Sequence, residues 1–172
     1  MHALVVYESM FGNTKAIAEA IAEGLAGGMR AEVAEVASAP VVVGEDVCLL
    51  VVGGPTHAFG LSRVSTRQSA AEQAKGAPLV SQGRGVREWL GALRTSSATL
   101  GAAAFDTRVA KPRMPGSAAR AVARRLRRAG VRLAGPAQSF YVDGVRGPLL
   151  PGELERAREW GESLAAAHAV PA

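Results

Sequence analysis

Residues 3–25 read ALVVYESMFGNTKAIAEAIAEGL and combine a strand pattern, a polar turn and a helix pattern. The stretch opens with Leu4–Tyr7, an apolar run short enough for a strand that is buried on both faces of a sheet. It ends with Thr14–Leu25, where the apolar residues recur at helical spacing and Gly27-Gly28 ends the helix. A polar turn, SMFGNT, joins the two. This turn is either an ordinary connection with a helix cap or a place where a ligand is held.

The rest of the chain repeats this alternation. Further strands are predicted at Ala31–Val36, Val47–Val52, Thr99–Phe105 and Arg132–Val142, the last weakened by Gly135 and Pro136. Further helices are predicted at 86–93, at 117–128 with Ser117 as cap and Gly130 after it, and at 153–167 with Leu154, Ala157, Gly161 and Leu164 facing inward. Polar residues 60–84 are expected to form a long loop. The pattern predicts one α/β domain over residues 1–172, with helices on both faces of a parallel sheet.

In such sheets ligands bind beyond the carboxyl ends of the strands. This rule directs attention to three turns, Glu8–Thr14, Gly53–Gly60 and Asp106–Gly116. The first turn offers a helix N-terminus, whose unpaired N–H groups and partial positive charge suit a phosphate. Ser9, Asn13 and Thr14 add polar side chains, and the turn has neither the GxGxxG nor the GK[ST] pattern. It therefore argues against a dinucleotide or a nucleoside triphosphate at this position.

The stretch VVYESMFGNTKAIAEAIAEGL resembles the first strand, phosphate loop and first helix of flavodoxins. The second turn, VVGGPTHAFG, resembles the flavin-contacting loop of the flavodoxin-like group, and AAFDTRV stands where the family places its third flavin loop. The closing helix in PGELERAREWGESLA also matches. The resemblance implies a three-layer, doubly wound flavodoxin-like fold of the short-chain form, with a five-stranded parallel sheet in the order 2-1-3-4-5.

The family binds FMN without a covalent link, so the resemblance also implies a set of binding residues. For the phosphate these are Ser9, Met10, Phe11, Gly12, Asn13 and Thr14. For one edge of the isoalloxazine they are Pro55, Thr56, His57 and Phe59, and for the other side Phe105, Asp106, Thr107 and Arg108. His57 either acts on the flavin or only packs on it, and Asp106 either bonds the flavin or only caps its turn.

Two departures from the family affect function. Flavodoxins usually stack the flavin between Trp and Tyr, and neither type occurs in the second and third loops here; Met10, His57 and Phe59 are the available substitutes. Flavodoxins are also strongly acidic, whereas this chain carries a formal charge of +5. Arg108, Lys111 and Arg113 follow the fourth strand, so we expect a less negative flavin potential than in an acidic flavodoxin.

The leading functional prediction is an electron-transfer carrier that works with a redox partner protein. One alternative is an NAD(P)H-dependent, quinone reductase-like oxidoreductase with the 60–84 segment over the flavin. Another is a flavodoxin-like domain that has lost FMN and serves as an interaction module. No nicotinamide site is recognisable in the sequence, which favours the carrier over the enzyme.

Composition narrows the remaining classes. The single cysteine, Cys48, sits in an apolar run where burial is expected, and one thiol cannot build a Cys-rich metal site. The chain shows no apolar run that would span a bilayer and begins without a signal-peptide pattern, so a cytoplasmic location is expected. Nucleic acid is disfavoured as a partner because no aromatic residues interleave with the arginines of 120–128.

Overall fold

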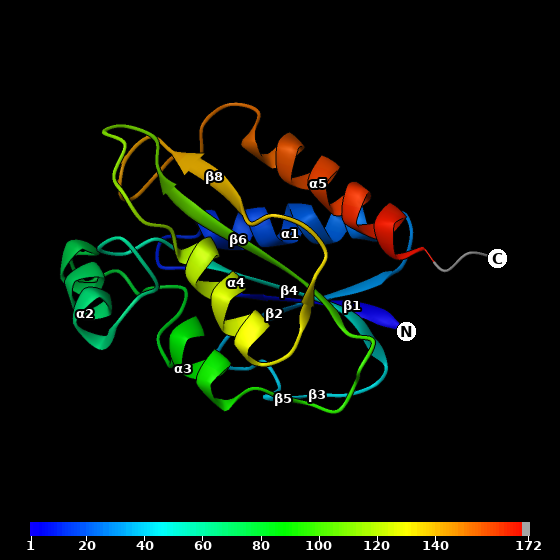
Figure 1. Ribbon diagram of the computed structural model, residues 1–172. Helices are drawn as coiled ribbons and strands as arrows, with labels where there is room; N and C mark the ends of the chain where they lie inside the picture. The colour runs from blue at the N-terminus through cyan, green and yellow to red at the C-terminus, as the bar shows by residue number, and fades with distance from the viewer. Residues whose placement is uncertain (170–172) are drawn as a thin grey trace.

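The computed structural model describes residues 1–169. The strands are β1 (His2–Tyr7), β2 (Arg30–Glu35), β3 (Val42–Val43), β4 (Val47–Pro55), β5 (Arg94–Thr95), β6 (Gly101–Val109), β7 (Arg132–Leu133) and β8 (Gln138–Val142). The helices are α1 (Asn13–Leu25), α2 (Val64–Gln73), α3 (Val86–Ala92), α4 (Ala118–Arg128) and α5 (Glu153–His168). The predicted alternation of strands and helices holds in outline, although β2, β3 and β4 follow one another without a helix between them (Figure 1).

The main sheet has the order β2-β1-β4-β6-β7, and β8 also pairs with β6. All of these pairs are parallel, with β1 in the middle of the β2–β1–β4 set. The predicted order 2-1-3-4-5 is confirmed, because β4 and β6 are the third and fourth positions and β7 with β8 fills the fifth. The fifth strand is interrupted at 134–137, where Gly135 and Pro136 stand. Proline has no N–H for the ladder, which accounts for the gap.

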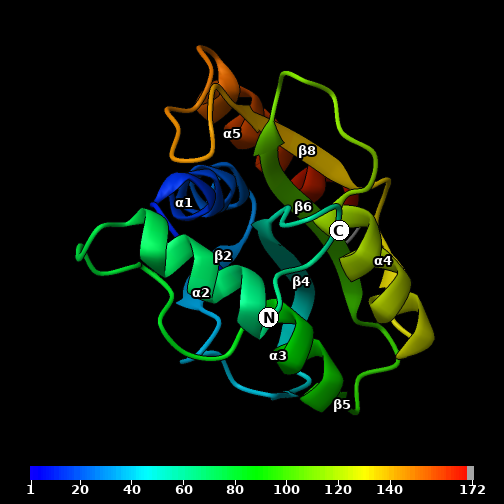
Figure 2. The ribbon, with the colours of Figure 1, turned by 90° about the vertical axis from the view of Figure 1, so that its left-hand side faces the viewer.

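Helices cover both faces of the sheet (Figure 2). On one face α1 and α5 enclose a core that includes Ile17, Ile21 and Phe105. On the other face α3 and α4 enclose a second core that includes Trp89 and Leu126. Ser117 caps α4 as predicted, since its Oγ accepts a hydrogen bond from the Arg120 N–H.

The expectation of a long loop over residues 60–84 is wrong, because this segment contains the ten-residue helix α2. The polar sequence VSTRQSAAEQ has no apolar stripe, and Ala70 is the only buried residue of the helix. Thr66 stabilises its first turn by accepting a hydrogen bond from the Arg63 N–H at 2.8 Å. In Figure 2 this helix lies in front of the sheet, at the end where β6 and β8 finish.

Three smaller expectations also need correction. Leu154, in the first turn of α5, does not face inward as predicted but is 48% exposed. Cys48 is only partly buried, and its Sγ lies 3.4 Å from the carbonyl oxygen of His2. The strands β3 and β5 form a separate two-stranded sheet that the sequence does not signal.

Candidate functional site

The turn between β1 and α1 presents a helix N-terminus with free donors. Gly12 adopts a left-handed conformation with φ of 97° at the N-cap, and no side chain of the described residues caps α1. Ser9 is fully buried, and its Oγ accepts a hydrogen bond from the Gly12 N–H at 3.1 Å. This bond leaves the hydroxyl proton of Ser9 free to donate. The first N–H groups of α1 have no intrahelical partner and suit an anion.

A second segment fixes the shape of this turn. Ser81, between α2 and α3, accepts a hydrogen bond from the Ser9 N–H through its Oγ at 2.9 Å, and its own N–H donates to the Ser9 carbonyl at 2.7 Å. The Val80 N–H donates to the Met10 carbonyl at 3.0 Å. Sequence reasoning missed this support, because the contact joins residues about seventy positions apart and no local pattern announces it.

The second turn follows β4, which extends to Pro55. Thr56 donates its N–H to the Thr107 carbonyl at 2.9 Å, so the turn is tied to β6. His57 and Gly60 pair through both backbone bonds, and Ala58 and Phe59 between them have positive φ values of 44° and 73°. The Nδ1 atom of His57 lies 3.2 Å from the Thr66 Oγ1 on α2. Burial, with a smaller contribution from the Arg67 charge, lowers the pKa of His57, so its neutral form dominates at neutral pH.

The third segment differs from the expected turn, because β6 continues through Asp106, Thr107 and Arg108 to Val109. Phe105 is fully buried in the core, and a Cβ on Gly53 would lie 2.3 Å from its ring. Thr107 reaches the first turn, with its Oγ1 2.6 Å from the Thr14 Oγ1.

Asp106 acts as a cap. Its Oδ2 accepts hydrogen bonds from the Thr56 hydroxyl at 3.0 Å, the Ser117 hydroxyl at 2.5 Å and the Ala119 N–H at 3.1 Å. Of the two interpretations that the sequence left open, the hydrogen bonds favour the structural one. Asp106 therefore joins the second turn to the start of α4.

A cavity of about 260 Å³ opens where these segments meet. Ten of the predicted site residues line it: Ser9, Met10, Phe11, Asn13, Thr14, Pro55, Thr56, His57, Thr107 and Arg108. Four predicted residues do not: Gly12, Phe59, Phe105 and Asp106. The lining residues that sequence reasoning missed come largely from α2 and from the end of β8: Ala58, Thr66, Ser69, Ala70, Gln73, Val109, Val142 and Val145.

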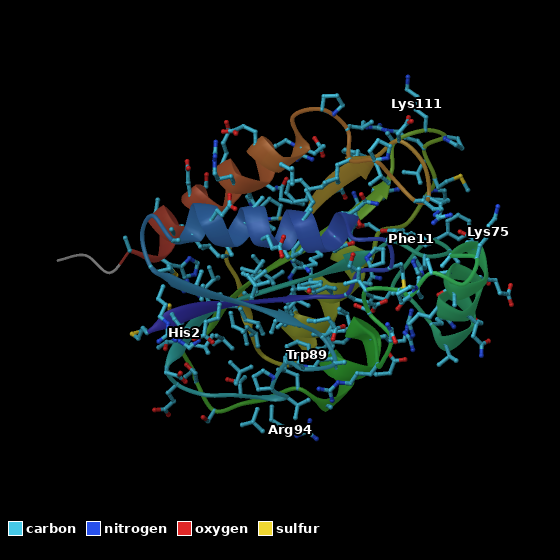
Figure 3. The ribbon with its side chains drawn as sticks, turned by 180° about the vertical axis from the view of Figure 1, so that it is seen from behind. His2, Phe11, Lys75, Trp89, Arg94 and Lys111 are labelled. Carbon is cyan, nitrogen blue, oxygen red and sulfur yellow. The ribbon has the colours of Figure 1, made fainter. Side chains whose placement is uncertain are left out.

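The connection between β8 and α5 closes one side of this cavity. The Arg146 guanidinium lies over the Phe11 ring, 5.4 Å from its centroid, and donates to the Gln73 carbonyl at 3.3 Å. A Cβ on Gly147 would lie 2.8 Å from the Asn13 amide. Figure 3 shows Phe11, Lys75 and Lys111 at one end of the molecule and His2 at the other, so these connections gather at the carboxyl edge of the sheet.

The residues present fit a phosphate joined to a flat apolar group. The first turn supplies the N–H groups, hydroxyls and amide that a phosphate requires. Met10, Pro55, Ala58, Val109 and Val142 supply apolar walls. The cavity volume of about 260 Å³ lies just below the roughly 300–1,000 Å³ typical of cofactor sites. Among the described residues, neither Trp nor Tyr lines the cavity, so the Trp and Tyr that usually stack on the flavin in flavodoxins have no counterpart in its walls.

The chain is similar in fold to solved flavodoxins and to part of a larger protein. A flavodoxin from the domain Archaea is 19% identical, with 96% of this chain and 97% of that chain covered and a TM-score of 0.63. Oxidised flavodoxin 1 from Bacillus cereus is 15% identical, with 99% and 100% covered and a TM-score of 0.67. Rubredoxin oxygen:oxidoreductase from Desulfovibrio gigas is 15% identical with a TM-score of 0.61, and 96% of this chain matches 35% of that one.

At these identities the structural likeness concerns the fold alone. A comparison with curated protein sequences gives no match. The sequence model of the family described as flavodoxin matches residues 5–108, which include the second half of β1, the first turn, α1, β4 and nearly all of β6. Because this match covers more than half of the chain, the protein belongs to the flavodoxin family.

Proposed function

We propose that the protein binds FMN in this cavity and serves as an electron-transfer carrier for a protein partner. The observation that carries the proposal is the uncapped N-terminus of α1, which faces a cavity whose remaining walls are largely apolar. A phosphate at the helix end and a flat ring against the apolar walls would use both features. Membership in the flavodoxin family supports the same ligand.

When bound, a flavin supplies the redox chemistry, and the protein orients it and tunes it. In the proposed site the first turn holds the phosphate through Ser9, Asn13 and Thr14. His57 stays neutral near pH 7 and lines the cavity beside Thr66 of α2. Among the described residues, no helix is long and apolar enough to cross a membrane.

Flavin titration of the apoprotein tests the proposal. We expect FMN to bind at least about tenfold more tightly than riboflavin, because hydrogen bonds to a charged phosphate contribute about 1.5–3 kcal/mol. Asn13→Ala should weaken FMN binding and leave riboflavin binding unchanged. Gln68→Ala, which truncates an amide on α2 outside the cavity, is the matched control. Equal affinities for FMN and riboflavin would contradict a phosphate-binding turn, and no flavin binding would favour the interaction module.

One feature of the cavity favours the reductase as a second candidate function. Neither Trp nor Tyr of the described residues lines the cavity, and a flavin with one open face suits a substrate that must reach the ring. Anaerobic addition of NAD(P)H to the FMN-loaded protein separates the two functions. A carrier should stay oxidised until a reductase is added, whereas an oxidoreductase would lose its absorbance within the first turnovers.

A further inference from the structure

The positive charge of this protein is concentrated in one part of the chain. Residues 107–142 contain nine Lys and Arg and no Asp or Glu. The remaining residues contain eleven Lys and Arg against fifteen Asp and Glu, so the rest of the chain is acidic. The basic segment runs from the end of β6 through the following loop, α4, β7 and β8. A uniform bias in composition would not produce this division.

Part of this charge gathers in a cavity of about 340 Å³ beside the flavin-binding site, which we call the arginine pocket. Its charged lining comes from three segments and consists of Arg63, Arg87, Arg124, Arg125 and Arg128, without a carboxylate. Among the described residues, none of these five arginines forms an ion pair. Among the described residues, the Glu88 charge acts on Arg87 from a distance, but no carboxylate lines the pocket to neutralise the five guanidinium groups.

Arg87 is held in place at the floor of this pocket. Its Nη2 donates to the Leu61 carbonyl at 2.8 Å and its Nε donates to the Ser62 carbonyl at 3.1 Å. Burial lowers the pKa of Arg87, and the neighbouring charges of Arg63 and Arg125 lower it further, although the Glu88 charge acts in the other direction. The arginines thus repel one another, and an anion in the pocket would relieve the repulsion.

The loop that precedes α4 lines a second basic cavity. It measures about 330 Å³ and is lined by Arg108, Arg113 and Arg120 together with Met114. Arg108 also lines the flavin-binding cavity, and Ala58 lines both that cavity and the arginine pocket. Both basic cavities therefore adjoin the candidate site.

Two exposed apolar side chains belong to these two cavities. Phe59, which lines the arginine pocket, is 53% exposed, and Met114, which lines the second cavity, is 48% exposed. The two segments touch, since a Cβ on Gly116 would lie 2.1 Å from the Phe59 carbonyl oxygen. An apolar centre with a charged rim is the usual anatomy of a protein interface.

We propose that this face docks an acidic protein, with carboxylates of the partner entering the two basic cavities and an apolar patch covering Phe59 and Met114. Charge complementarity of this kind steers association and fixes orientation. A small phosphorylated ligand would occupy one cavity and leave the other, and the apolar centre, unused. The α4 arginines have no interleaved aromatic residues, which disfavours nucleic acid. Electron transfer across this face depends on the proposed function, but the docking itself does not.

A pair of matched probes tests the docking. Native cytochrome c is basic, and its succinylated form carries carboxylates in place of lysine amines on the same fold. We titrate each form into the isotope-labelled protein without flavin and follow the amide signals. The acidic form should bind, with shifts around Phe59, Met114 and α4, and the native form should not. Its affinity should fall at least about tenfold between about 20 and 200 mM salt, because salt screens such contacts.

Two double variants with the same change in net charge locate the surface. Arg124→Glu with Arg128→Glu should weaken binding of the succinylated form at least tenfold. Arg30→Glu with Arg158→Glu, on β2 and α5, should change it less than twofold, provided that both variants keep the wild-type melting temperature. Equal losses in the two variants would overturn the proposal, as would no binding of the acidic form. Tighter binding of a short DNA duplex, or full competition by inorganic pyrophosphate, would also overturn it.

Failure of docking and failure of the proposed function give different results. Loss of flavin binding with docking intact would remove the carrier function and leave the acidic-protein interface. Flavin binding without docking would leave the carrier and remove this interface.

Discussion

Glu8 is a carboxylate placed in the interior at the end of β1. It is 1% exposed, and its Oε1 accepts a hydrogen bond from the Val86 N–H at 2.7 Å. A Cβ on Gly85 would lie 2.5 Å from this oxygen, so only glycine lets α3 start so close to Glu8. Burial raises the pKa of Glu8, although the Ser62 and Val86 hydrogen bonds and the Arg67 charge act in the other direction.

The raised pKa of Glu8 predicts a loss of stability with rising pH. The folded protein keeps a proton on Glu8 that the unfolded chain has already released, so the free energy of unfolding falls as pH rises from the ordinary glutamate pKa through the raised one. Glu8→Gln should remove this fall and melt at or above the wild-type temperature at pH 7. Melting curves across pH 4 to 8 measure it, with exposed Glu72→Gln as control. Parallel curves for wild type and Glu8→Gln would contradict the prediction.

The lowered pKa of His57 predicts a loss of stability with falling pH, opposite to the dependence expected for Glu8. Burial lowers the pKa of His57, so the unfolded chain takes up a proton before the folded protein does. Stability should therefore fall as pH drops below the ordinary histidine value of about 6.5. In the His57→Gln variant this part of the acid-side loss should be absent, which urea unfolding at pH 7.5 and 5.5 can detect. A wild-type protein whose acid-side loss equals that of the variant would refute it.

At the scale of elements, two glycines let α1 and α5 pack at close range. A Cβ on Gly24 would lie 2.0 Å from the Arg158 carbonyl oxygen, and one on Gly161 would lie 2.2 Å from the Ile21 carbonyl oxygen. Neither backbone atom can move without separating the helices. The contact therefore requires residues without a side chain at both positions.

The same glycine-to-alanine substitution should therefore have opposite effects on stability at this contact and at a helical position away from it. Gly161→Ala should destabilise the protein by about 1–3 kcal/mol, the usual cost of overpacking, despite the better helix propensity of alanine. Gly91→Ala in α3 meets no atom within 4 Å and should be neutral or stabilising by up to about 1 kcal/mol. Denaturant unfolding of both variants gives the comparison. A Gly161→Ala protein as stable as the wild type would show that the helices can move apart freely.

The elements also show what the sequence could predict. Strands β1, β4 and β6 and helices α1, α4 and α5 have strong apolar patterns, so their order and most of their burial follow from periodicity alone. Helix α2 buries only Ala70, and its position depends on contacts that no local pattern encodes. The same holds for Ser81 and Arg146, which shape the first turn from distant parts of the chain. The part of the cavity formed by the first turn was therefore predictable, and its α2 wall was not.

At the scale of the whole molecule, the charges are divided between two parts of the protein. The basic segment 107–142 borders the candidate site, while the acidic residues lie in the rest of the chain. Arg108 lines the cavity itself, and Lys111 lies at the same end of the molecule as Phe11 (Figure 3). Positive charge at this edge favours any group there that gains an electron.

We expect the reduction potential of the FMN-loaded protein to be less negative than that of acidic flavodoxins. Arg108→Gln should make the potential more negative, because it removes a charge from the cavity wall, and added salt should reduce the difference. Arg30→Gln, at an exposed position on β2, removes the same charge far from the site and should leave the potential unchanged. Potentiometric titration measures all three proteins. If both variants shift the potential equally, the net charge of the protein rather than the placement of Arg108 sets the potential. A wild-type potential as low as that of the acidic flavodoxins would contradict the prediction.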